Sequence, residues 1–273
     1  MFVDQELARR IEQAEAAMTR DGATALVRAG RAPRAFVRDL GTGVAACVRP
    51  GSALNKVIGI GVDGAVDERA LAAVEAGFRE LGEPVRAEVS TLAVPEAWEQ
   101  LAARGYRLAG FENVLVRAAA GPRPSAPGGI DLTVDDPVAL FAATIGEAFC
   151  SPDGTGAVLD QLTRAAIAEA TEDLAVMPGV RRYLARREGA PAGAANLRLD
   201  GAVAILAGSA TLPAHRRRGV QSALLARRLQ DAGDAGADLV VVTTAPGTQS
   251  QANMMKAGFA LAYARAVLVA PVA

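Results

Sequence analysis

The alternation of apolar and polar positions predicts strands and helices in regular succession along the whole chain. Apolar residues at helical spacing open the chain, through Leu7, Ile11, Ala14 and Met18, and are typical of a surface helix. Apolar runs bounded by Gly, Pro and Asp predict strands over residues 56–62, 85–91, 106–116, 130–135, 180–187, 191–199, 203–212, 238–244 and 259–269. Helical spacing predicts helices over residues 67–81, 95–104, 137–149, 157–174, 219–232 and 250–257. This mixture predicts an α/β fold (α+β in its connections) around a mixed sheet.

A stretch rich in structure-breaking residues divides the chain. Residues 121–129 read GPRPSAPGG and show no apolar periodicity, which is typical of a linker. They separate residues 1–120 from residues 130–273, and both segments have ordinary domain lengths. The sequence therefore predicts two domains.

The two halves echo one another at a constant offset. Shifting the chain by 153 residues against itself places Gly105 on Gly258, and residues 114–116 on residues 267–269. The same ungapped shift also matches identical residues in the helix and the strand that precede them. A constant offset across several elements favours a duplicated domain, and its period is far too long for a solenoid.

The charge and composition of the chain argue against several classes of binding partner. The formal net charge is −1, which argues against a general attraction to nucleic acid or to anionic membranes. Cys47 and Cys150 are the only cysteines and His215 is the only histidine, so a zinc site or a disulfide framework is not expected. No apolar run approaches the roughly 20 residues that span a bilayer, and the acidic N-terminus is unlike a signal peptide. We expect a cytoplasmic protein without metal, nucleic acid or membrane, acting as a monomer or homodimer.

The junction between the strand at 203–212 and the helix at 219–232 carries the clearest chemistry. It reads PAHRRRGVQS, from Pro213 to Ser222. The first N–H groups of a helix lack partners within the helix, and the helix dipole makes this end attractive to an anion. Gly219 removes a Cβ where a ligand must approach the backbone, and the arginines supply charge and paired donors. Together these features favour a pyrophosphate site over a basic helix start on a solvated surface.

The string TLPAHRRRGVQSALL resembles the main motif of the Gcn5-related N-acetyltransferase (GNAT) superfamily, Gln/Arg-x-x-Gly-x-Gly/Ala. Arg216, Gly219 and Gln221 hold the three marked positions, although Gln221 departs from the small residue of the motif. The resemblance implies two tandem acyl-CoA N-acyltransferase-like (GNAT) domains. Residues 130–273 would be the one that binds acetyl-CoA, and residues 1–120 a degenerate copy without the phosphate loop.

The resemblance also implies how the cofactor, acetyl-CoA (CoA), is held. In this superfamily, backbone amides after the arginine bind the pyrophosphate, and the end of the preceding strand pairs with the pantetheine arm. An asparagine of the last helix commonly contacts the cofactor. The corresponding residues are Ala210, Thr211, Leu212, Arg216, Arg217, Arg218, Gly219, Val220, Gln221, Ser222 and Asn253.

The catalytic groups depart from the family pattern. Family members often place a catalytic tyrosine four residues before the glycine of the last helix, and that position is Met254, which cannot donate a proton. Ser250 and Tyr263 are the nearest replacement donors, although Tyr263 also fits a half-buried strand residue with a satisfied hydroxyl. Glu147 and Asp153 fall in the helical segment that usually lines the acceptor pocket. They could bind a cationic substrate, or be ordinary surface carboxylates.

A second glycine pattern lies in the first half. Residues 59–64 read GIGVDG and match the dinucleotide fingerprint G-x-G-x-x-G. Asp63, Asp67 and Glu68, however, place carboxylates at the helix start, where they satisfy the dipole and repel a phosphate. The offset of 153 places Asp63 on Arg216, so we expect no phosphate site in the first half.

Two classes of function remain open. In the GNAT family a neutral amine attacks the acetyl thioester directly, without an acyl-enzyme. The first hypothesis is therefore an N-acetyltransferase for a small-molecule amine acceptor. The second is a non-catalytic acyl-CoA-binding sensor or regulatory protein that has kept the loop and lost turnover, which Met254 favours.

Overall fold

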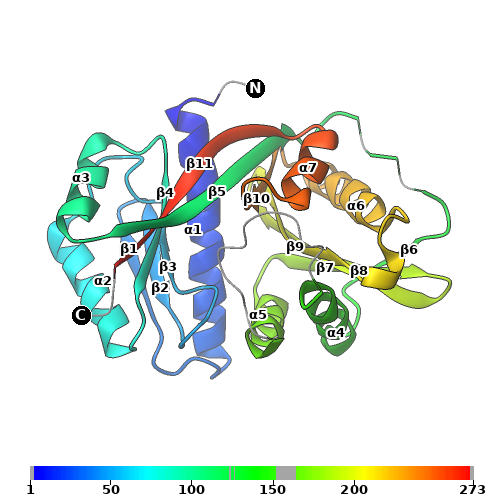
Figure 1. Ribbon diagram of the computed structural model, residues 1–273, viewed down its shortest axis with the longest axis horizontal. Coiled ribbons are helices and arrows are strands. Elements are labelled where there is room, and N and C mark those ends of the chain that lie inside the picture. The colour runs from blue at the N-terminus through cyan, green and yellow to red at the C-terminus, as the bar shows by residue number, and fades with distance from the viewer. Residues whose placement is uncertain (1–2, 123, 126, 152–163, 271–273) are drawn as a thin grey trace. The chain divides into compact units, whose positions relative to one another are not determined.

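The structure is a computed structural model that describes residues 3–122, 124–125, 127–151 and 164–270 (Figure 1). Its internal contacts divide the chain into two compact units. The first unit comprises Met1–Val114, Val176–Pro178 and Leu261–Ala273, and the second comprises Leu115–Ala175 and Gly179–Ala260.

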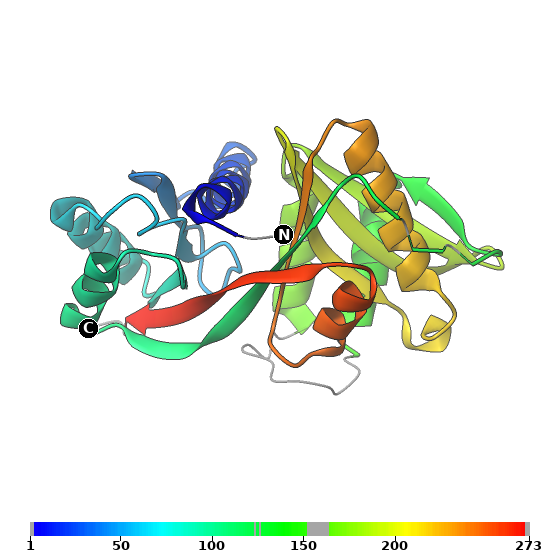
Figure 2. The same cartoon turned by 90° about the horizontal axis from the view of Figure 1, so that it is seen from above.

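The first unit is a sheet with helices on both faces. Its elements are α1 (Gln5–Arg28), β1 (Phe36–Leu40), β2 (Gly43–Cys47), β3 (Lys56–Ile58), α2 (Glu68–Glu80), β4 (Val85–Ser90), α3 (Pro95–Ala103), most of β5 (Arg107–Ala118) and nearly all of β11 (Ala260–Ala270). The strand order is β1-β2-β3-β4-β11-β5, with β3 and β4 parallel. Side chains of the strands alternate between the faces, so Val44 and Ile58 pack on α1 while Val57 and Ala87 pack on α2 and α3 (Figure 2).

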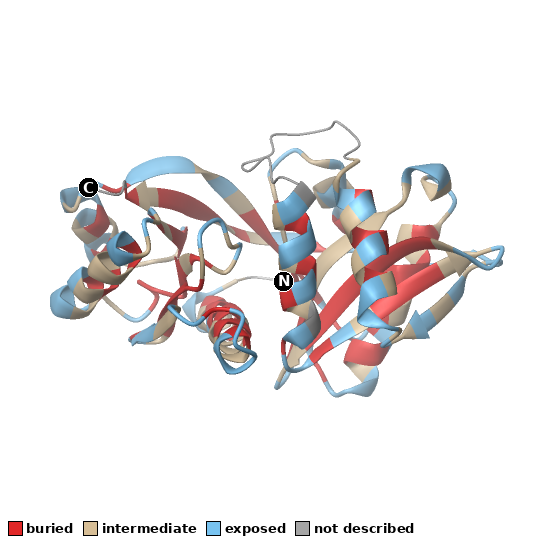
Figure 3. Ribbon diagram, turned by 90° about the horizontal axis from the view of Figure 1, so that it is seen from below, coloured by how far each residue is buried: buried red, intermediate tan, exposed pale blue. Residues whose placement is uncertain are grey.

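The second unit has the same layered design. Its elements are the end of β5, β6 (Asp131–Val134), α4 (Val138–Phe149), α5 (Arg164–Val176), β7 (Val180–Arg187), β8 (Ala190–Asp200), β9 (Val203–Thr211), the 3-10 turn η1 (Pro213–His215), α6 (Val220–Asp234), β10 (Leu239–Thr244) and α7 (Gln249–Lys256). The order is β5-β10-β9-β8-β7-β6. α4 packs on one face and α6 on the other, each buried on the side that meets the strands (Figure 3). None of the helices within the described residues is long and apolar enough to cross a membrane.

The repeat expected from the sequence is visible in the order and bounds of the elements. Moved by 153 residues, the first residues of α2, β4, α3 and β5 fall on or beside the first residues of α6, β10, α7 and β11. The agreement is within one residue at all four elements. The predicted fold, a mixed α/β sheet built twice, is confirmed. The sequence did not predict β1 and β2, which lie between the N-terminal helix and β3.

The last strand of the second repeat leaves the unit formed by the rest of that repeat, and in the first repeat only the end of the last strand does so. β11 pairs antiparallel with β4 of the first unit, in a register that runs from Arg265↔Ser90 to Ala270↔Val85. Leu115–Ala118 at the end of β5 belong to the second unit, where β5 neighbours β10. The linker thus separates two repeats in sequence, whereas the compact units divide the chain within β5 and place nearly all of β11 with the first repeat.

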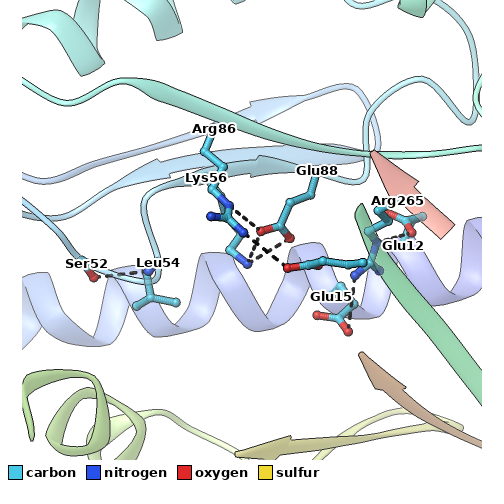
Figure 4. Close-up of polar contacts among 9 residues, drawn as sticks. Glu12, Glu15, Ser52, Leu54, Lys56, Arg86, Glu88 and Arg265 are labelled. Carbon is cyan, nitrogen blue, oxygen red and sulfur yellow. Dashed lines mark hydrogen bonds and ion pairs between the residues drawn. The ribbon is translucent and has the colours of Figure 1, made fainter. Parts of the chain in front are cut away.

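A buried polar cluster holds β11 in the first unit (Figure 4). The Arg265 guanidinium on β11 lies 2.8 Å from the Glu12 carboxylate on α1, and both side chains are at most 2% exposed. The Tyr263 hydroxyl donates to the same Glu12 oxygen over 2.6 Å. Glu15, one turn further along α1, is also buried, and burial raises the pKa of its carboxyl. The predicted N-terminal helix is therefore present, and its buried face also carries the carboxylates Glu12 and Glu15, which the sequence did not indicate.

Candidate functional site

The parallel strands β9 and β10 separate after a short paired stretch. Their register covers three pairs, from Val203↔Leu239 to Ile205↔Val241, although β9 continues to Thr211. A β-bulge at Gly208, whose φ is +41°, interrupts the pairing of β9 with β8 on its other side. Beyond Ile205, β9 therefore keeps β8 as its neighbour and turns an open edge toward β10.

The direction of the backbone groups on this open edge follows from the register. The Leu212 N–H donates to the Ala192 carbonyl of β8 over 2.9 Å, so Leu212 and Ala210 face β8. By alternation, Ser209 and Thr211 turn their N–H and C=O groups to the open edge. An extended ligand can pair with such an edge as an added strand does.

The loop after β9 forms a concave, uncapped helix start. Arg217 has a φ of +59° and Gly219 a φ of +81°, so two residues of the loop lie in the left-handed region. Gly219 is the N-cap of α6 but supplies no side-chain cap, and no acidic residue lies in the first turn. Backbone N–H groups gathered in this way, with the helix dipole behind them, form an anion-binding concavity.

The three arginines of the loop have different surroundings. The Arg216 guanidinium is half-buried and donates to the Thr211 carbonyl, at 3.4 Å, and to the Ser151 carbonyl. Arg217 and Arg218 are exposed at the mouth of the loop. Arg216 therefore orders the loop, while its two neighbours are the cations that an incoming anion meets.

Gly219 is required by two independent features of the loop. Its positive φ is one, and a Cβ there would lie 2.0 Å from the Cγ of Pro127 in the linker. A linker residue therefore packs on the first residue before α6, and only glycine fits between them.

Comparison with known proteins agrees with this geometry. Residues 154–259 match the family model described as the acetyltransferase (GNAT) family. The second half carries a GNAT-family domain. The match includes β9, the loop, α6, β10 and α7, so it contains the candidate cofactor site.

Solved structures place the whole chain among GNAT folds. A GCN5-related N-acetyltransferase from Kribbella flavida is 20% identical with a TM-score of 0.66, covering 97% of this chain and 96% of its own. A tandem GNAT protein from the clavulanic acid biosynthesis pathway, solved without AcCoA, is 15% identical with a TM-score of 0.61, covering 89% and 85%. A GCN5-related N-acetyltransferase from Sphaerobacter thermophilus is 14% identical with a TM-score of 0.55, covering 87% and 76%. No curated protein sequence matches the chain. At these identities the likeness shows a shared fold, here a tandem one.

The helix α7 carries the remaining cofactor candidate of the GNAT domain. Asn253 is half-buried, and its Oδ1 accepts from the Gln249 side chain over 2.8 Å. Ser250 is exposed in the first turn of the same helix. Met254 is 2% exposed and packs in the core of the second unit. The place of the usual family tyrosine is thus filled by an apolar core residue.

Tyr263 is not placed to act as the proton donor. It is buried in the first unit, where its hydroxyl donates to Glu12. Burial, followed by the Glu12 charge, raises the pKa of Tyr263 and keeps the phenol neutral. Tyr263 is therefore a buried strand residue with a satisfied hydroxyl, and we do not assign it a catalytic role.

One of the two acceptor candidates, Glu147, lies on the helix α4. Glu147 is exposed and lines a shallow cavity of about 470 Å³ between α4 and α5. Small side chains form the rest of its lining, namely Ala142, Ala143, Gly146, Ser151 and Ala168. Asp153 lies outside the described residues. Among the residues that the structure describes, the cavity therefore offers the Glu147 carboxylate to a cationic group.

The glycine pattern of the first unit is explained by packing and capping. The Asp67 side chain caps α2 by accepting from the Ala70 N–H over 2.8 Å, and the Arg9 guanidinium pairs with Asp63. Gly61 has a φ of +79°, and a Cβ there would lie 2.9 Å from the Cβ of Ala97. The helix start that resembles a dinucleotide site is thus occupied by the chain's own carboxylates.

Gly61→Ala is expected to destabilise the first unit without changing CoA affinity. The new Cβ would combine left-handed strain with a clash against α3, which costs about 1–3 kcal/mol in the free energy of unfolding. Denaturant unfolding and calorimetry with CoA measure the two effects. A large loss of CoA affinity in a folded G61A protein would mean that residues 59–64 do bind the cofactor.

Proposed function

We propose that the protein transfers the acetyl group of acetyl-CoA to an amine of a small-molecule acceptor. The match of the second half to the GNAT family supports acyl transfer. Acetyl transfer to an amine, and a small molecule as the acceptor, are the parts that we add. The observation that carries the proposal is the uncapped start of α6, with Arg217 and Arg218 exposed beside it, next to the open edge of β9. We further propose that it works in the cytoplasm, as a monomer or homodimer.

The residues divide the binding of acetyl-CoA between two adjoining features. The N–H groups at the start of α6 and the two exposed arginines suit the pyrophosphate, whose charge they offset. The open edge at Ser209 and Thr211 suits the amides of the pantetheine arm. When bound there, acetyl-CoA supplies an acetyl thioester at the separation of β9 and β10.

The acceptor amine must lose its proton before it can attack the thioester. Primary amines of the lysine type have a pKa near 10.4, so a neutral amine needs assistance from a pocket, a water or a base. Glu147 can gather the cationic form at the α4 cavity without itself touching the reacting atoms. The thiolate that leaves, with a pKa of about 8.5 on the cysteine scale, needs little help from an acid.

A non-catalytic acyl-CoA sensor is the second candidate. Met254 in the core and the commitment of Tyr263 to Glu12 favour it, because they leave Ser250 as the one candidate proton donor that is not buried. The cofactor loop serves both functions equally.

Calorimetry followed by an activity screen separates the two candidates. The protein is titrated with acetyl-CoA and with CoA, and thiol release is then followed across classes of small amines. We expect saturable binding, and thiol release with at least one amine class above the hydrolysis background. Binding without release from any class would leave the sensor, and absence of binding would overturn both functions.

A further inference from the structure

A buried arginine lies beneath the open edge of β9. Arg228 of α6 is 1% exposed. Its guanidinium donates to the Asn196 carbonyl at 3.1 Å, the Ser209 hydroxyl at 3.3 Å and the Leu224 carbonyl at 3.2 Å. All three acceptors are neutral, and within the described part of the chain Arg228 makes no ion pair with a carboxylate. Burial lowers the pKa of Arg228 to about 10, so the group is still a cation at neutral pH.

A cation in this place is costly for the fold. Removing an ion from water without a counter-ion costs several kcal/mol even after relaxation. Arg228 occupies the buried face of α6 between Leu224, Leu225 and Leu229, where a leucine would pack without that penalty. The arginine therefore serves something other than the stability of the core.

Arg228 contacts β8 and β9 at the β-bulge between these two strands. The register between β8 and β9 shifts between Ala195 and Asn196, opposite the bulge at Gly208. Arg228 donates to Asn196 on one side of this shift and to Ser209 on the other. It therefore fixes β9 relative to β8 where the ordinary ladder of hydrogen bonds is interrupted.

The same network reaches the first turn of α6. The Ser209 hydroxyl donates to Oε1 of Gln221 over 2.9 Å. Gln221 is the residue at which the loop departs from the small residue of the GNAT motif. Its side chain is thus directed to β9, and it connects the anion-binding start of α6 with the open strand edge.

We propose that Arg228, Ser209 and Gln221 are positioning residues that hold the open edge of β9 in register with the start of α6. The inference rests on the proposed function, since it concerns how CoA is bound there. The network places the Ser209 and Thr211 backbone groups so that the pantetheine arm and the pyrophosphate are bound together. None of the three side chains needs to touch the reacting atoms.

The test compares two ligands that have the same nucleotide and pyrophosphate, only one of which carries the pantetheine arm. CoA has both the pyrophosphate and the pantetheine arm, whereas 3′-phospho-ADP has the pyrophosphate and lacks the arm. In Ser209→Ala, calorimetry is expected to show CoA affinity lowered about tenfold, the equivalent of one or two backbone hydrogen bonds, with 3′-phospho-ADP affinity within about twofold of the parent. Ser209→Thr keeps the hydroxyl and should retain the CoA affinity of the parent.

Arg228→Lys supplies an independent variant. Lysine keeps the charge, but its donors share one nitrogen and cannot span acceptors that Arg228 reaches from Nε, Nη1 and Nη2, so it should reproduce the selective loss of CoA affinity. Thermal unfolding of each variant shows that the fold is retained, and Ser209→Ala keeps the test decisive if Arg228→Lys does not fold.

The outcomes separate this inference from the proposed function. A parent protein that binds neither ligand overturns the proposed function and the inference with it. If the parent binds CoA, then an equal loss of both ligands in Ser209→Ala, no loss of either, or a Ser209→Thr variant as weak as Ser209→Ala would each overturn the positioning role alone.

Discussion

Replacing Arg265 with methionine is expected to lower the free energy of unfolding by about 3–5 kcal/mol. The Arg265 and Glu12 side chains are 1% and 2% exposed, so the substitution would leave the Glu12 carboxylate buried, with the Tyr263 hydroxyl as its remaining side-chain donor among the described residues. An uncompensated buried charge is among the most destabilising changes a point mutation makes. Denaturant unfolding of the purified protein measures the effect.

Two controls show whether the ion pair is responsible. The double variant Glu12→Leu with Arg265→Met removes both charges and should recover much of the stability lost in the single variant. Arg20→Ala breaks the exposed pair with Asp39 and should change the free energy of unfolding by at most about 1 kcal/mol. A single Arg265 variant as stable as Arg20→Ala would contradict the assignment of this pair to the core.

The order of the elements and the cofactor loop could be predicted from the sequence because both depend on local signals. Apolar periodicity and turn residues place each strand and helix, and HRRRG at a strand-to-helix junction is local in the same way. The offset of 153 residues added one long-range fact, because identical residues at a fixed spacing need no structure to be seen. From these signals follow the tandem fold and the contrast between the two helix starts.

The place of β11 in the first unit could not be predicted in this way. Apolar alternation shows that β11 is a half-buried strand but does not say whether β10 or β4 pairs with it, because both are apolar parallel-type strands. The deciding contacts are polar. Arg265 and Glu12 are 253 positions apart in sequence, and each taken alone has the character of a surface residue.

Arg228 was missed for a related reason, although its spacing held a clue. In ALLARRLQDA the buried face of α6 runs through Leu224, Leu225, Leu229 and Ala232, and Arg228 falls on that same face. An arginine on the buried apolar face of a helix needs hydrogen-bond acceptors inside the protein. Those acceptors lie at a β-bulge, which the sequence marks only by Gly208 within a strand.

The corresponding helices α2 and α6 of the two repeats differ in the charges at their N-termini. At α6 the N-cap is Gly219 and the flanking residues are arginines, whereas at α2 the N-cap is Asp67, followed by Glu68. The corresponding helix thus has its positive end left without a carboxylate in one copy and neutralised in the other. The distribution of charge, rather than the glycine spacing, decides which copy can bind a phosphate.

The double variant Arg217→Ala with Arg218→Ala is expected to lower CoA affinity about 100-fold. Arg216 is the arginine that the motif marks, but its guanidinium is engaged by the Thr211 and Ser151 carbonyls, so the exposed pair is the sharper choice. A charge-assisted hydrogen bond contributes about 1.5–3 kcal/mol, and at exposed positions the lower value gives about tenfold per arginine. Calorimetry at two salt concentrations measures the loss, which should shrink as salt rises.

The matched control removes charge from the other copy of the helix start. Asp63→Ala with Asp67→Ala also deletes two charged side chains beside a glycine-rich turn, yet it should leave CoA affinity within about twofold, because those carboxylates serve Arg9 and the α2 cap. If both double variants weakened CoA equally, the cofactor would not be bound by the α6 loop alone. A selective loss would tie CoA recognition to the helix start whose positive end the chain leaves unneutralised.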